Sequence, residues 1–207
     1  MINLLTDRLP DSIAIRGQAY SINPDFRLMV RLDILLSLFQ DEAETDERAA
    51  ALLSLFREFL PELEQLIITV SVAEIVKAVM NFYACSDGRS ENGSNESEEQ
   101  QERYHSFLYD STYIYAAFMQ AYRIDLTRAR LHWFQFRALL LALPQDCLFS
   151  RIVDYRSTDL ADVPEGKRDF YRKMKRRYAL PLPQAEQEKN DAVAEALMNG
   201  GDLTGVL

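Results

Sequence analysis

Residues 126–143 read LTRARLHWFQFRALLLAL, and apolar side chains lie on almost every side of this segment when it is drawn as a helix. That pattern is typical of a helix that other elements surround. Asp125 is a suitable capping residue in front of the segment, and Pro144 cannot continue it. We therefore expect a central buried helix over 126–143, against which the rest of the chain packs.

Shorter patterns on both sides of this segment complete a helical fold. Apolar residues recur at helical spacing in six further segments, which are 26–39, 52–60, 62–84 with a break near 69–71, 111–122, 147–155 and 165–179. Two short runs of strand type, 12–15 and 18–22, flank Arg16-Gly17, which suits a two-residue turn. The sequence predicts a mainly α fold, a multi-helix single domain over 1–182 with a short N-terminal β-hairpin at 12–22.

Two segments lack these patterns. Residues 86–103 contain no apolar side chain, so nothing in them offsets the entropy lost on ordering, and we expect a disordered acidic loop. Residues 183–207 follow Leu180-Pro181-Leu182-Pro183, which cannot continue a helix. These last residues carry five acids and one base, and their weak apolar spacing predicts an acidic C-terminal helical arm.

The composition limits the class of protein. The chain has 207 residues, 48% hydrophobic and 27% charged, which is typical of a soluble globular protein. Its two cysteines, Cys85 and Cys147, cannot build a disulfide framework and favour a reducing compartment. The sequence has no signal peptide pattern and no apolar run long enough to span a bilayer. We expect a cytoplasmic protein without a membrane partner.

The sequence predicts no enzyme, no cofactor and no metal site. Neither His105 nor His132 lies in a metal-binding spacing, and the glycines form no phosphate-binding loop. On the expected central helix, one side would carry a polar stripe of Asp125, Arg128, His132 and Gln135. Such a stripe would suit an acid/base site with His132 as proton carrier, although a solvated or hydrogen-bonded face is far commoner.

A basic segment is the main candidate for function. Residues 167–177 contain seven bases and one acid, within a chain of net charge −9. Phe170, Met174 and Tyr178 recur at four-residue spacing and are predicted to dock on the core, which leaves the bases on the surface. This surface would suit a phosphate backbone, an acidic partner segment or the acidic arm, and the alternative is an ordinary solvated helix face. The net negative charge disfavours general nucleic-acid binding.

Two further features add candidate contact residues. Aromatic side chains crowd into 104–122, where they form either a partner surface or part of the core, and Arg137 would suit a ligand carboxylate or an aromatic ring. The residues predicted to bind a partner are Arg168, Arg172, Lys173, Lys175, Arg176, Arg177, Tyr113, Tyr115, Trp133 and Arg137.

Several blocks of the sequence are similar to one known family. The blocks are MINLL at 1–5, YSINPDFR at 20–27, YIYAAF at 113–118, IDL at 124–126, HWFQFRAL at 132–139, YR at 155–156 and FYRKMKRRYALP at 170–181. With them the chain resembles the bacteriophage gene-product-fifteen family, small proteins encoded in the tail modules of siphophages and prophages of Gram-positive bacteria. The resemblance covers residues 1–181, and 40–103 match only in character.

The resemblance implies a function in tail morphogenesis. Proteins encoded just before the tape-measure gene typically act as tail assembly chaperones, which self-associate and coat the tape-measure protein in the bacterial host cytoplasm. Other tail proteins are further expected partners, and the chaperone would be absent from the mature virion. One alternative is a structural tail component that stays in the virion. A third is a nucleic-acid-binding protein that uses the basic helix at 167–177.

Overall fold

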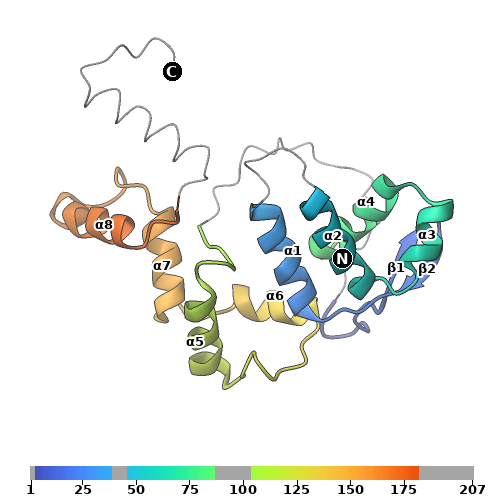
Figure 1. Ribbon diagram of the computed structural model, residues 1–207. Helices are drawn as coiled ribbons and strands as arrows, with labels where there is room; N and C mark the ends of the chain where they lie inside the picture. Colours follow the sequence, from blue (N-terminus) through green and yellow to red (C-terminus); the bar gives the residue numbers. More distant parts are fainter. Residues whose placement is uncertain (1–2, 39–45, 87–103, 182–207) are drawn as a thin grey trace, which may run out of the picture.

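The computed structural model describes residues 3–38, 46–86 and 104–181 (Figure 1). These residues form helices and one antiparallel hairpin, so the predicted mainly α fold with a short N-terminal β-hairpin is confirmed. Of the predicted loop at 86–103 only Ser86 is described, and the predicted arm at 183–207 lies outside the described residues. The elements are β1 (Ser12–Ile15), β2 (Gln18–Ser21), α1 (Phe26–Leu38), α2 (Asp46–Phe59), α3 (Leu63–Thr69), α4 (Val72–Tyr83), α5 (Ser111–Tyr122), α6 (Trp133–Leu141), α7 (Leu148–Ser157) and α8 (Glu165–Arg177).

The hairpin turns where the sequence predicts and is held against α4. Arg16 and Gly17 have φ angles of 50° and 79°, the positive values that a tight two-residue hairpin turn requires. The Arg16 guanidinium donates to both carboxylate oxygens of Glu74, at 2.9 and 2.7 Å. These hydrogen bonds, together with one from the Ser71 hydroxyl, lower the pKa of Glu74 to about 2. The turn residue that sets the hairpin also anchors it.

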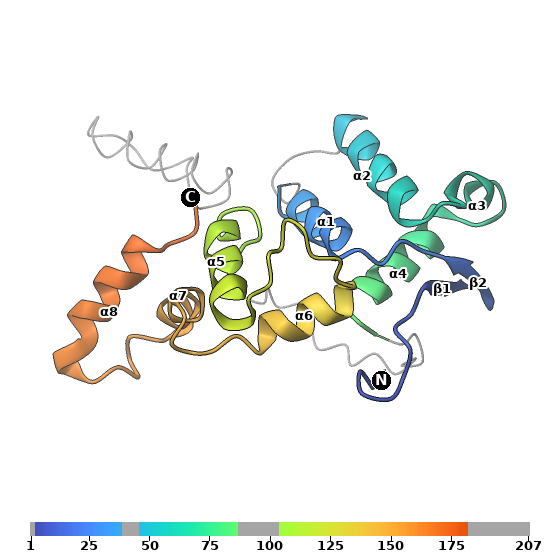
Figure 2. The same ribbon diagram turned by 90° about the horizontal axis from the view of Figure 1, so that it is seen from below.

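The molecule is elongated, with the hairpin and α2–α4 at one end and α7 and α8 at the other (Figures 1 and 2). Between them, α1 packs on both α2 and α6. The chain continues outward from this centre, since α5 packs on α7 and α7 on α8. The last helix is therefore mounted on the end of the structure.

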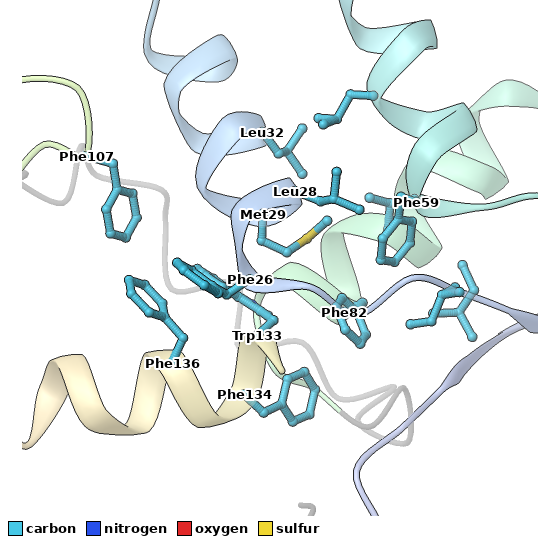
Figure 3. Packing of buried hydrophobic residues seen from close by; sticks show 14 of the residues in the cluster. Phe26, Leu28, Met29, Leu32, Phe59, Phe82, Phe107, Trp133, Phe134 and Phe136 are labelled. Carbon is cyan, nitrogen blue, oxygen red and sulfur yellow. The ribbon is translucent and has the colours of Figure 1, made fainter. Parts of the chain in front are cut away.

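Aromatic rings on α6 join the middle of the molecule (Figure 3). Phe136 is 1% exposed, and its ring stacks on Phe26 of α1 at 4.5 Å and on Phe118 of α5 at 5.2 Å between centroids. On another side of α6, Phe134 packs against Phe82 of α4 at 5.1 Å. These contacts place α6 at the centre as its apolar sequence predicts, although its last residue, Leu141, is 80% exposed.

The central helix is shorter than predicted, because α6 begins at Trp133 and not at Leu126. Asp125 does start a helical turn, since its carbonyl oxygen accepts the backbone N–H of Ala129 at 2.8 Å. Arg27 then donates to the carbonyl oxygens of Leu126 at 2.7 Å and Ala129 at 3.0 Å. A continuing helix would need those two oxygens for its own hydrogen bonds. The side chain from α1 therefore ends the first turn.

The first residues of α1 and α6 lie side by side, which fixes where the helix starts again. The backbone N–H of Phe26 donates to the Leu131 carbonyl at 3.1 Å, and that of Trp133 donates to the Pro24 carbonyl at 2.9 Å. Two segments that are distant in the sequence are thus joined by backbone hydrogen bonds. In a continuing helix the backbone N–H of Trp133 would donate to the Ala129 carbonyl oxygen, but here it donates to Pro24 instead.

Candidate functional site

The basic segment forms α8, and its ends match the helix dipole. Pro164 occupies the N-cap position, where its missing N–H removes no hydrogen bond within the helix. Glu165 lies in the first turn, whereas Lys175, Arg176 and Arg177 lie in the last. Acids near the N-terminus and bases near the C-terminus stabilise a helix. The predicted helix spans 165–179, and α8 ends two residues earlier, at Arg177.

The face of α8 that packs on α7 overlaps the predicted one but does not coincide with it. The spacing of Phe170, Met174 and Tyr178 predicted a docking face, but Phe170 is 50% exposed. Within the helix the half-buried residues are Tyr171, Met174 and Lys175, and Tyr178 follows at the C-cap. Steps of four residues drift around a helix of 3.6 residues per turn, so a contact face follows steps of three and four. Met174 and Tyr178 therefore lie on the packing face as predicted, whereas Phe170 is half exposed and only contacts Tyr155 edge-on.

Tyr155 of α7 supplies the aromatic contact that holds α8. Its ring is buried and meets the rings of Phe170 at 5.9 Å and Tyr171 at 5.7 Å, both edge-on. The ring of Tyr178 is stacked on it at 6.3 Å. No residue of α8 is itself buried. The helix therefore lies on the surface of α7 and keeps most of its own surface in solvent.

The outer side of α8 carries exposed cations on successive turns. Arg172, Lys173, Arg176 and Arg177 line a shallow depression together with Asp169, and we call these four cations the basic face. Asp169 forms an ion pair with Arg172, but both side chains are well exposed. Such a pair is worth at most about 1 kcal/mol. The four bases that share this face thus hold a net positive charge in solvent.

The other two predicted bases of α8 do not belong to the basic face. Arg168 points back along the chain, and its Nε donates to the Val163 carbonyl oxygen at 2.8 Å. A weaker contact at 3.4 Å joins the same guanidinium to the Ala161 carbonyl oxygen. Lys175 is half-buried on the side of α7. The side chain of Arg168 therefore binds the loop before the helix, and that of Lys175 lies on the face that packs on α7.

Arg156 of α7 fixes the direction of α8, and sequence reasoning missed this role. Its guanidinium donates to both carboxylate oxygens of Asp110, at 2.6 and 2.9 Å, and these side chains are 10% and 2% exposed. Arg156 also donates to the carbonyl oxygen of Tyr178 at 2.6 Å and to that of Tyr104 at 3.0 Å. One side chain thus joins the end of α8 to α7 and to the segment before α5.

Asp110, the partner of Arg156, has a role that its place in the sequence does not indicate. Its position before Ser111 predicts a helix cap, but no side-chain capping hydrogen bond forms there. The carboxylate instead accepts from Arg156 and from the backbone N–H of Ser106 at 2.9 Å. The only signal for the role of Arg156 was that Tyr155-Arg156 is one of the sequence blocks similar to the family.

Two of the remaining candidates support the interior of the molecule. Trp133 is 2% exposed, and its Nε1 donates to the Tyr83 carbonyl oxygen at 2.8 Å. Arg137 is half-buried and donates to the same oxygen at 3.2 Å. The Trp133 ring is also stacked on the Tyr83 ring at 5.5 Å. These two residues hold the end of α4 against α6 and lie away from the basic face.

The two tyrosines of α5 occupy different positions. Tyr113 is half-buried, and its ring meets Tyr178 edge-on at 6.4 Å, so it borders the C-cap of α8. Tyr115 is 37% exposed, and its hydroxyl donates to the Asp125 carboxylate at 3.3 Å. Only Tyr113 therefore lies near the basic helix.

His132 caps α6 instead of lying on a polar helix face. Its Nδ1 accepts the backbone N–H of Phe134 at 3.0 Å, while the Gln135 side chain accepts the N–H of His132 at 3.1 Å. Because Nδ1 is an acceptor, Nε2 carries the proton and donates to the Pro10 carbonyl oxygen at 3.0 Å. Burial lowers the pKa of His132, and the Pro10 carbonyl opposes this less strongly. The predicted stripe with Asp125 and Arg128 does not form, since the helix starts only after His132.

Other chemically reactive side chains also have packing roles. The His105 ring meets Phe107 at 5.5 Å and Phe149 at 6.1 Å, both edge-on. Cys147 caps α7, where its sulfur accepts the N–H of Ser150. Burial raises the pKa of the Cys85 thiol. Among the described residues no three His, Cys, Asp or Glu side chains gather as metal ligands would, and no helix there could cross a bilayer.

These features define a mainly helical protein with an exposed basic helix at one end. Residues 5–180 match the family model described as Bacteriophage Gp15 protein, so the chain belongs to that family and is a phage protein. The resemblance found in the sequence is confirmed. The match includes all of α8 and ends just after it, whereas residues 183–207 lie outside. No curated protein and no solved structure matches the chain.

Proposed function

We propose that this phage protein is a non-enzymatic tail assembly chaperone that binds the tape-measure protein. The basic face of α8 is the observation that carries the proposal. Its four cations lie in solvent as two adjacent pairs one turn apart, on a helix that Arg156 holds in a fixed direction. Cations at this spacing suit acidic side chains along one face of a partner helix.

The strength of such contacts suits a chaperone. Exposed ion pairs contribute about 0 to 1 kcal/mol each and are screened by salt, so several together give a reversible complex. A chaperone must release its client when the tail tube forms around it. The basic face therefore supports a contact that holds the client without trapping it.

Charge favours a protein partner over nucleic acid. The whole chain has a net charge of −9, which repels a phosphate backbone at long range. A short acidic segment of a protein approaches one helix and avoids most of that repulsion. We further propose that several copies act on each tape-measure chain in the host cytoplasm, with other tail proteins as later partners. The resemblance implies a gene just before the tape-measure gene, and this position supports a role in the host cytoplasm with many copies per client.

Co-expression with the tape-measure protein encoded nearby tests the proposal. We expect size-exclusion chromatography with light scattering to show a soluble complex with many copies of this protein per tape-measure chain. The triple variant Lys173→Glu, Arg176→Glu and Arg177→Glu should lose the complex. A matched control, Lys77→Glu, Arg128→Glu and Arg130→Glu, changes the net charge equally at exposed sites outside α8 and should keep it.

Three outcomes would contradict the proposal in different ways. A free monomer beside insoluble tape-measure protein would argue against binding. Stoichiometric copies in purified phage particles would favour a structural tail component. Retention on DNA that weakens steeply with salt would favour the nucleic-acid alternative.

A further inference from the structure

We propose that the basic face of α8 is the docking site of the acidic C-terminal segment of this same chain, residues 183–207, which competes there with the partner. This inference adds a regulation to the proposed function and rests on it only for the role of α8 as the binding surface.

The two segments carry opposite charges and are adjacent in the chain. The helix α8 contains seven bases and two acids, whereas residues 183–207 contain five acids and one base. Among the residues that the structure describes, Asp169 is the one acid that lines the depression of the four bases on the basic face. An acidic segment tethered a few residues away reaches an effective concentration of the order of millimolar. Weak pairing is then enough for occupancy.

The acids of the C-terminal segment have the spacing that a helical contact needs. Glu188, Asp191 and Glu195 are three and four residues apart. In a helix, residues at these intervals lie on one side, as do the cations of the basic face. Ion pairs between the two rows would therefore form without distorting either backbone.

The connection lets the chain reverse its direction. Arg156 holds the Tyr178 carbonyl, so the chain leaves α8 from a fixed point. Pro181 and Pro183 prevent the helix from continuing. The 13 residues of α8 span about 20 Å, and the ten residues from 178 to 187 reach roughly 33 Å when extended. The acids can thus return along the whole basic face.

The limits of the family match separate this segment from the body that carries the basic face. The match covers residues 5–180 and stops between α8 and the acidic segment. The segment thus lies outside the matched body and directly follows the helix whose access it would control. A partner that supplies more acidic residues would displace it.

Binding of a fluorescein-labelled poly-glutamate peptide to the full-length protein tests this inference by fluorescence anisotropy at low ionic strength. We expect the variant Glu188→Gln, Asp191→Asn and Glu195→Gln to bind the peptide roughly tenfold more tightly than the unmodified protein, since the tethered competitor is removed. The matched control Glu96→Gln, Glu98→Gln and Glu99→Gln changes the net charge by the same amount and should stay within about twofold. Adding Lys173→Glu, Arg176→Glu and Arg177→Glu to the first variant should abolish binding.

Each other result would overturn the inference. Equal affinity for the first variant and the unmodified protein means that the segment does not occupy the basic face, while the proposed contact with the tape-measure protein would stand. Equal gains in the first variant and its matched control would assign the effect to net charge. A gain confined to concentrations at which light scattering detects dimers would place a second copy's segment on the helix. Absence of peptide binding in every variant would contradict the role of α8 itself.

Discussion

In the interior, the ring of Phe136 is buried between rings from α1 and α5, and α6 also buries Trp133, Phe134 and Leu140. At the junction of α7 and α8, no residue of α8 is buried, and the guanidinium of Arg156 holds the helix end by directed hydrogen bonds. Apolar burial thus holds the first region together, whereas the hydrogen bonds of Arg156 and the ring contacts of Tyr155 hold the second. The surface of α8 is therefore free to vary without loss of the fold.

The first prediction tests the interior side of this comparison. Phe136→Ala removes a ring that contacts Phe26 and Phe118, so it creates a cavity where three helices meet. We expect the free energy of unfolding, measured in urea, to fall by about 3 to 5 kcal/mol. Phe170→Ala is the control, because this side chain of α8 is half exposed. Its cost in unfolding free energy should be about 1 kcal/mol or less. Equal losses would break the comparison.

The second prediction tests the polar junction. Arg156→Met leaves the Asp110 carboxylate buried without its partner, and we expect a loss of about 3 kcal/mol in unfolding free energy. Hydrogen exchange should also quicken in α8, because the hydrogen bond to the Tyr178 carbonyl is gone. The double variant Arg156→Met and Asp110→Leu removes both charges and should recover much of the loss. If the double variant is no more stable than the single one, the buried charge is not the cause.

The third prediction concerns the cap of α6, at the edge of the interior. The folded state holds the pKa of His132 below its ordinary value of 6.5, mainly through burial. The unfolded chain therefore binds a proton more readily, and this contribution is complete above about pH 6.5 and is lost as the pH falls toward the lowered pKa. Protonation would also place a proton on Nδ1, which accepts the N–H of Phe134.

His132→Asn keeps a good N-cap and removes the titration. We expect urea denaturation between pH 7 and 5 to show a smaller loss of stability for this variant than for the unmodified protein. Parallel curves for the two proteins would show that other groups cause the acid sensitivity.

The helices were predictable because their signals are local, whereas the start of α6 was not. Apolar spacing and the Arg16-Gly17 turn act within a few residues, and both lead to the observed elements. The first turn after Asp125 has the expected hydrogen bonds, but Arg27 captures the carbonyl oxygens that would extend it. That interaction joins residues about a hundred positions apart, which no local pattern records.

The candidate site divides along the same line. A run of bases at helical spacing predicts a basic helix, and four of the six predicted bases share its outer face. Sequence alone does not say that Lys175 packs on α7 or that Arg168 binds the preceding loop, since both depend on where α7 lies. Arg156 was missed for a similar reason, because its partner Asp110 resembles a cap until the tertiary structure is known.

The last prediction has the smallest effect on stability and sharpens the comparison most. Lys173→Gln, Arg176→Gln and Arg177→Gln remove the charge of the basic face at exposed positions, and we expect a change in unfolding free energy of less than about 1 kcal/mol. The corresponding change to Glu places two acids, at positions 176 and 177, in the last turn, where they oppose the helix dipole at a cost of about 0.3 to 1 kcal/mol for each. Circular dichroism and urea denaturation of the two variants would separate the effect of the helix dipole on stability from the effect of packing. A loss with Gln as large as that of Phe136→Ala would mean that the basic face stabilises the fold, and any loss of partner binding in these variants would then reflect unfolding.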